Sequence, residues 1–264
     1  MLNKKFKASL LHLLISAIII SCFTGFALWV WYPPPFLKIS GLLSILLILV
    51  TIDLILGPLL TFFIYKPNKP KLAIDLAVIA VVQLAALGYG IHTIQQGHPA
   101  YVAYNIDRFT LVNIAEVVPL NAKHPELRAS GWWKPIMVYS KPPTDPSEQE
   151  RLIFEVLSGK PDIDARPEYY EPFNKFANEV MQKGLTPQQI SKTPENKQKL
   201  EAFITKYGKA ANDYAFLPLV GKEKDVLWVW DKDTEQPVGT LDINPWKLPK
   251  IANNGDTTAQ QNKN

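Results

Sequence analysis

Residues 42–65 have the sequence LLSILLILVTIDLILGPLLTFFIY, an apolar run that contains a single charged side chain, Asp53. Two further runs of the same kind flank it, Ala8–Trp31 before it and Leu72–Ile91 after it. Each run reaches the roughly 20 residues that a helix needs to cross about 30 Å of hydrocarbon. Beyond Ile91 the composition is that of an ordinary globular domain. The sequence therefore predicts three transmembrane helices followed by one water-soluble domain.

The distribution of lysine predicts the orientation of these helices. Three lysines precede the first run and three lie between the second and the third, whereas the loop between the first and the second carries only Lys38. Lysine and arginine in short loops mark the cytoplasmic side of a membrane. We therefore expect a multi-pass protein of the bacterial inner membrane, with a cytoplasmic N-terminus and a periplasmic C-terminal domain.

The net charge divides unevenly between these two parts. The whole chain carries a net charge of +4, but residues 1–91 hold seven lysines against two aspartates, which leaves 21 basic and 22 acidic residues for the remainder. The basic character belongs to the membrane anchor, so it gives no reason to expect nucleic acid as a partner. The single cysteine, Cys22, lies inside the first run, and the expected soluble domain therefore has neither disulfides nor thiolate metal sites.

The soluble part predicts an α+β domain that ends in an antiparallel β-meander. Runs rich in β-branched and aromatic residues predict strands at Tyr101–Asn105, Phe109–Val112, Ile136–Tyr139, Tyr214–Val220, Val226–Trp230 and Pro237–Ile243. Apolar residues at helical spacing predict helices at about 145–158, 172–184 and 194–207. We expect a membrane anchor at 1–96, the periplasmic domain at 97–250 and a disordered polar tail at 251–264.

Motifs for catalysis or cofactor binding are missing from the sequence. Its four histidines are not spaced as metal ligands, and it contains neither a glycine-rich phosphate loop nor a G-x-S-x-G elbow. The alternating carboxylates of Asp231–Glu235 lack the glycine that a calcium loop needs at its sixth position, and they predict a hairpin turn instead. We therefore expect no enzyme activity, no catalytic residues, no cofactor, no metal site and no small-molecule substrate.

Two short motifs in the soluble domain are candidate partner contacts. Asp107 and Arg108 follow a strand, where an ion pair is a simpler interpretation than an acid–base pair. Trp132 and Trp133 form an adjacent aromatic pair that suits a binding surface. By contrast, the alternation of strand residues places Val226, Trp228 and Trp230 on one face of a strand, which predicts a position in the core for the two tryptophans.

Polar residues inside the apolar runs predict contacts between the membrane helices. Asp53 and Gln83 each lie about twelve residues from the inner end of their run, a depth of about 18 Å at 1.5 Å per residue. A carboxylate at this depth is costly unless it is protonated or hydrogen-bonded, so we expect Gln83 to donate to it. His12 and Asp75 lie near the cytoplasmic boundary, where they are candidates to pair. A proton pathway is the alternative interpretation, which the lack of a second acidic residue near the midplane disfavours.

Further short motifs occur within about the first 110 residues and near the C-terminal end of the chain. They are Lys7–Ser9 with His12–Leu13, Trp31–Pro35, Asp53–Thr61, Asp75–Ala77, Gln83–Gly90, Asp107–Phe109, Phe216–Leu219 and Leu241–Trp246. In this order they resemble the TfpX/TfpZ family of type IV pilin accessory proteins. The resemblance implies an inner-membrane protein that accompanies the major pilin and influences its assembly into pili. It supplies no catalytic residues.

The function expected from the sequence is therefore that of a non-enzymatic accessory protein of type IV pilus biogenesis, which binds pilin or a pilus assembly protein. Two alternatives stay open. One is a pilin-modifying membrane enzyme, for which Asp107, Asp231 and Asp233 are the first residues to test. The other is a proton-coupled membrane component that uses Asp53.

Overall fold

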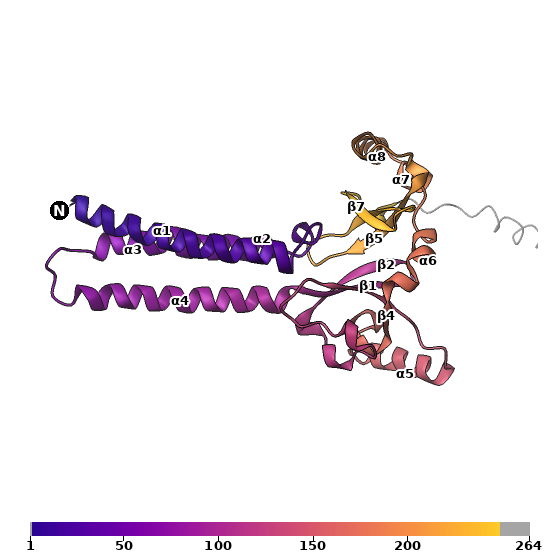
Figure 1. The fold of residues 1–264 in the computed structure, drawn as a ribbon, viewed down its shortest axis with the longest axis horizontal. Coiled ribbons are helices and arrows are strands. Elements are labelled where there is room, and N and C mark those ends of the chain that lie inside the picture. The colour runs from indigo at the N-terminus through magenta and orange to yellow at the C-terminus, as the bar shows by residue number, and fades with distance from the viewer. Residues whose placement is uncertain (1, 249–264) are drawn as a thin grey trace, which may run out of the picture.

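Three long apolar spans run together and project from one end of an α+β domain in the computed structural model, which describes residues 2–248 (Figure 1). They comprise Leu2–Trp31, Leu42–Ile64 and Leu72–Gly97, and each is long and apolar enough to cross a membrane. The N-terminus and the turn between the second and third spans lie at the end of the bundle far from the domain (Figure 1). The three predicted membrane-capable helices are confirmed. The expected polar tail, 251–264, lies outside the described residues.

The first two spans each contain a π-helical segment. The first consists of α1 (Leu2–Phe26) and the π segment Ala27–Trp31. The second consists of α2 (Leu42–Thr51), the π segment Ile52–Leu56 and α3 (Gly57–Ile64), and the third is the single helix α4 (Leu72–Gly97).

The cause of the second π segment is Pro58. A proline has no backbone N–H, so Pro58 cannot donate to the carbonyl of Leu54, and the helix widens just before it. The widened turn contains Asp53. The proline therefore sets the local geometry of the one acidic residue in this span.

The domain is built on one seven-stranded sheet with the order β4-β3-β1-β2-β5-β6-β7. Its strands are β1 (Pro99–Asn105), β2 (Arg108–Asn113), β3 (Ile136–Ser140), β4 (Tyr170–Pro172), β5 (Tyr214–Val220), β6 (Val226–Asp231) and β7 (Gln236–Leu241). Most neighbours are antiparallel, and the terminal meander β5-β6-β7 is confirmed. Two pairs, β1–β3 and β2–β5, are parallel, which the sequence did not predict.

Four helices accompany the sheet: α5 (Pro146–Leu157), α6 (Ala177–Gln182), α7 (Pro187–Ile190) and α8 (Pro194–Tyr207). The first and last agree with the predicted helices. The helix predicted at 172–184 is wrong in its first half, where Tyr170–Pro172 forms strand β4 and Phe173–Lys175 forms a 3-10 turn. Pairing of β4 with β3 takes precedence there over the helical pattern.

Alternation along the strands gives the sheet two apolar faces. In β6, Trp228 and Trp230 lie on the face that also holds Val180 of α6, whereas Leu227 and Val229 lie on the face covered by α7 and α8. The predicted core position of the two tryptophans is confirmed. Because both faces are covered, β6 is buried along its whole length.

The loop between the first and second spans enters the domain core. Phe36 and Ile39 are 5% and 1% exposed, and the Phe36 ring lies 5.7 Å from the ring of Trp228. The carbonyl of Ile39 accepts a hydrogen bond from the backbone N–H of Glu223 at 2.8 Å. The loop therefore attaches the first two spans to the domain, and the core of the region expected at 97–250 includes residues from before the second span.

Candidate intramembrane binding groove

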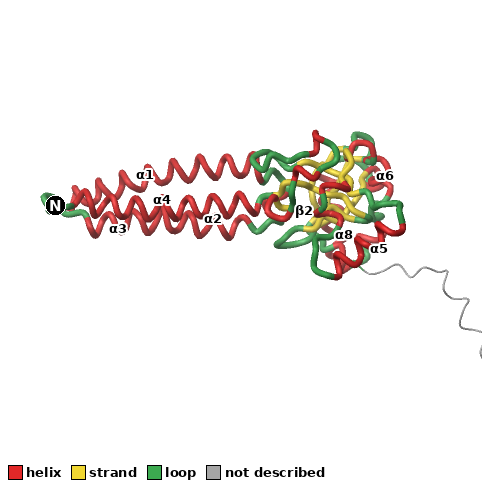
Figure 2. The backbone as a smooth tube through the Cα atoms, turned by 90° about the horizontal axis from the view of Figure 1, so that it is seen from below, coloured by secondary structure: helices red, strands yellow, loops and turns green. Residues whose placement is uncertain are grey.

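A groove of about 710 Å³ lies between α1 and α4, with the second span as its floor. It forms because α1 packs against α3, and α4 packs against α2 and α3. Figure 2 shows the three spans as separate rods running from the domain toward the N-terminus. Apolar side chains form most of its walls, among them Leu11 and Ile15 of α1 and Leu84 of α4, all of which are exposed. Polar side chains of α1, namely Lys4, Lys7, His12 and Ser16, also line it. The apolar part of these walls suits an apolar ligand.

A partly buried polar pair joins the floor of the groove to its α4 wall. Asp53 is 5% exposed, and Gln83 Nε2 donates to Asp53 Oδ1 at 3.3 Å. The structure thus brings together the two residues that the depth argument placed at the same level. Asp53 Oδ2 and Gln83 Oε1 are buried and have no hydrogen-bond partner within residues 2–248. Buried acceptors without donors are costly, so this site favours an added proton or a donor supplied by a ligand.

His12 and Asp75 do not pair with each other. His12 Nδ1 lies 2.6 Å from Thr61 Oγ1, and Asp75 forms an ion pair with Lys69 at 2.5 Å. Their expected pairing is therefore replaced by two other contacts. The reason is that α1 packs against α3, where Ser9 Oγ also donates to the carbonyl of Pro58 at 2.8 Å.

The candidate contacts in the soluble domain lie at opposite ends of β1. Asp107 and Arg108 form an exposed ion pair of 2.8 Å at the tip of the β1–β2 hairpin, where the guanidinium lies 4.7 Å from the ring of Trp246. Trp132 and Trp133 lie beside the bundle, where Trp132 contacts Trp31. The structure therefore joins neither pair to the groove between α1 and α4, and the two pairs do not form one surface.

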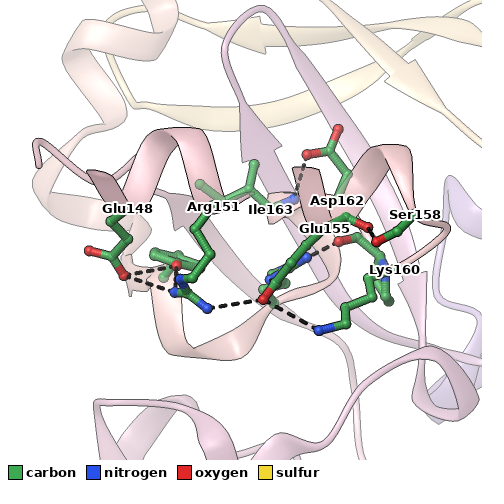
Figure 3. Close-up of polar contacts among 10 residues, drawn as sticks. Glu148, Arg151, Glu155, Ser158, Lys160, Asp162 and Ile163 are labelled. Atoms are coloured by element: carbon green, nitrogen blue, oxygen red, sulfur yellow. Dashed lines mark hydrogen bonds and ion pairs between the residues drawn. The ribbon is translucent and has the colours of Figure 1, made fainter. Parts of the chain in front are cut away.

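Helix α5 presents a surface that the sequence prediction missed. Its residues Ile153, Phe154 and Leu157 are exposed, although their spacing is typical of a helix face that packs on a core. Figure 3 shows the polar side of the helix, where Arg151 and Glu155 take part in a chain of ion pairs. The charges at 148, 151 and 155 share one helix face, and this spacing was available in the sequence as a signal.

One buried cation holds α5 to the domain. Arg166 is almost completely buried, and its guanidinium donates to Glu155 Oε2 at 2.5 Å. This hydrogen bond lowers the pKa of the Glu155 carboxyl to about 2. Because the folded pKa is depressed, the stabilisation is present above the usual value of 4.5 and is lost as the pH falls toward 2. Helix α5 is therefore anchored by charge at neutral pH, while Ile153, Phe154 and Leu157 face outward.

Groups of three or more histidine, cysteine, aspartate or glutamate side chains able to hold a metal ion do not occur among residues 2–248. The arrangement of the described side chains provides contact surfaces: an apolar groove with a polar floor, an exposed tryptophan pair, a charged hairpin tip and an exposed apolar helix face.

Comparison with known proteins identifies related sequences. Residues 1–41 match the family described as fimbrial assembly protein FimB. Over 92% of its length the chain is 24% identical to the fimbrial assembly protein of serogroup I and 25% identical to that of serogroup E1, both from Dichelobacter nodosus, and each match covers 96% of the relative. No solved structure matches.

A shorter relative matches with higher identity. The fimbrial assembly protein of serogroups C1 and C2 from Dichelobacter nodosus is 32% identical over 114 residues, which cover 42% of this chain and 87% of that protein. These matches support the broader resemblance to a fimbrial protein, and the TfpX/TfpZ name stays a prediction. The chain belongs to the fimbrial assembly protein family.

Proposed function

We propose that this chain is a membrane-anchored protein of fimbrial biogenesis that acts by binding a fimbrial component and not by catalysis. The family and the three membrane-capable helices support this role. The lysine distribution supports an inner-membrane location with the N-terminus in the cytoplasm and the domain in the periplasm. The fold agrees with that orientation, because the N-terminus and the lysine-containing turn 65–71 lie at the same end of the bundle (Figure 1).

The observation that carries the proposal is the groove between α1 and α4. Its walls are mostly apolar, and two acceptors that have no hydrogen-bond partner among the described residues, Asp53 Oδ2 and Gln83 Oε1, lie buried beside it. We assign it to an apolar helix of type IV pilin or of a pilus assembly protein embedded in the same membrane. A donor on that helix at the depth of Asp53 gains a hydrogen bond where water does not compete, worth about 1 kcal/mol.

The soluble domain supplies the second part of the binding surface. The exposed apolar residues Ile153, Phe154 and Leu157 on α5 are suited to the globular part of the same partner. The Arg166–Glu155 ion pair keeps this helix in place. A partner that has both a membrane helix and a globular domain therefore meets two separate surfaces, which adds specificity to the contact made in the membrane.

A deletion strain complemented with Asp53 variants tests this function. We expect loss of the gene to reduce surface fimbriae, counted by electron microscopy, and to leave the mass of the fimbrial subunit unchanged. Asp53→Asn keeps an acceptor for Gln83 and is expected to preserve both protein amount and fimbriation. Asp53→Leu removes the buried hydrogen bond and is expected to lower the folded amount.

Two outcomes would support a function other than binding. Loss of fimbriae in Asp53→Asn at normal protein amount would support a proton-coupled component that uses this carboxylate. A fimbrial subunit that loses a covalent modification in the deletion strain would support an enzyme, with Asp107, Asp231 and Asp233 as the first residues to substitute.

A further inference from the structure

Two large apolar side chains are exposed where the domain meets the bundle. Trp132 and Trp133, on the segment between β2 and β3, are 60% and 61% exposed. The ring of Trp132 lies 5.7 Å from the ring of Trp31, the last residue of the first span. The ammonium of Lys134 lies 5.2 Å from the ring centre of Trp29, which is itself exposed. The segment 132–134 is therefore at the level at which the first span ends.

Buried hydrogen bonds fix the position of this segment. The carbonyl of Gly131 lies 2.8 Å from Nε2 of His98 and accepts a hydrogen bond from Gln95 Nε2 at 3.1 Å. The His98 ring is fully buried and stacks on Trp31 at 5.3 Å. Gly131 itself has a φ of +74°, a conformation that favours glycine. The segment that carries the two tryptophans is thus held against the ends of the first and third spans.

We propose that Trp132, Trp133 and Lys134 form a membrane-interface anchor that inserts into the lipid headgroup layer on the domain side. The indole ring is apolar with one N–H donor, and tryptophan is enriched at this depth in membrane proteins. Lysine extends its apolar stem along such a surface and places its ammonium beside lipid phosphate. Trp29, at the end of the first span, already supplies an aromatic side chain at the same level.

This anchor has a consequence for the orientation of the domain. The loop containing Phe36 and the junction at His98 attach the domain to the spans. The proposed lipid contact at Trp132 and Trp133 attaches the domain to the membrane surface. The tryptophan pair is then occupied by lipid and is unavailable as a surface for a fimbrial partner. The inference rests on the membrane-spanning assignment made under the proposed function.

Quenching by spin-labelled lipids tests the anchor in the full chain. In a Cys22→Ser background, single cysteines replace Trp133, Trp29, Leu157 or Ile48 and carry an environment-sensitive fluorophore. Each variant is reconstituted in vesicles of phosphatidylcholine and phosphatidylglycerol with a nitroxide on the headgroup or deep in the acyl chain. We expect the headgroup nitroxide to lower emission about twofold or more at positions 133 and 29, and to leave position 157 unchanged.

The controls separate failure of the anchor from failure of the membrane assignment. An unquenched label at 133, with quenching at 29 by the headgroup nitroxide and at 48 by the deep nitroxide, would overturn the anchor and return the pair to protein binding. An unquenched label at 48 would contradict both the anchor and the membrane-spanning assignment. In a second series the label is placed at Ser130→Cys, which retains both tryptophans. There, Trp132→Ala with Trp133→Ala is expected to abolish quenching, whereas the comparably exposed pair Ile153→Ala with Phe154→Ala leaves it unchanged.

Discussion

Phe36→Ala is expected to lower the free energy of unfolding of the soluble domain by about 3 to 5 kcal/mol, the usual cost of removing a buried phenylalanine ring. The ring is 5% exposed and packs edge-on against Trp228 at 5.7 Å. Its removal leaves a cavity between the loop and the sheet. The effect is measured by chemical unfolding of the full chain in detergent, followed through tryptophan fluorescence.

Lys38→Ala is the matched control, because Lys38 belongs to the same loop and is exposed. We expect it to leave the unfolding midpoint unchanged. Gly221→Ala offers an independent approach to the same contact, since an added Cβ would lie 2.4 Å from the carbonyl oxygen of Ile39 and displace the loop. Wild-type stability in both Phe36→Ala and Gly221→Ala would show that the loop is not part of the core.

Gly57→Ala is expected to separate Gln83 from Asp53 and to destabilise the membrane bundle by about 1 to 3 kcal/mol, the cost of leaving a buried polar group unpaired. An added Cβ at residue 57 would lie 2.0 Å from Gln83 Nε2, the atom that donates to Asp53. The glutamine side chain therefore has to leave its present position. Titration of the reconstituted protein with a denaturing detergent measures the change.

Two further variants establish the mechanism of this effect. Gly88→Ala is the neutral control, because no atom lies within 4 Å of an added Cβ there, although Gly88 belongs to the same helix as Gln83. If Gly57→Ala acts through Gln83, it adds little to the cost of Gln83→Ala in the double variant. Full additivity of the two substitutions would contradict the proposed contact.

The sequence predicted features that depend on length, depth and alternation. The length of the apolar runs predicted the three spans, and the equal depth of Asp53 and Gln83 in their runs predicted their contact. The alternation of strand residues predicted that Trp228 lies on the core side of β6. The π segment that contains Asp53 was also predictable, because Gly57 and Pro58 interrupt an otherwise regular apolar run.

Features that depend on long-range packing were beyond the sequence. The parallel pairing of β2 with β5 joins strands separated by 100 residues of intervening chain, 114–213, which carry no local signal for it. Phe36 lies in a proline-rich loop. In such a loop the local sequence does not distinguish a phenylalanine that packs in the domain core from one that lies at the membrane interface. His12 lies near Thr61 and not near Asp75 because of the rotation of α1 about its axis, which its nearly uniform apolar composition does not specify.

Photo-crosslinking from the groove in fimbriated cells is the most direct test of the claim that it binds a fimbrial component. A benzophenone side chain replaces Leu84, which lines the groove and is 61% exposed, or Val82, which lies on the same helix outside the groove and is 62% exposed. We expect an adduct with type IV pilin or a pilus assembly protein from position 84 and not from position 82, at equal protein amounts. Equal adducts from both positions, or adducts with lipid alone from position 84, would contradict it.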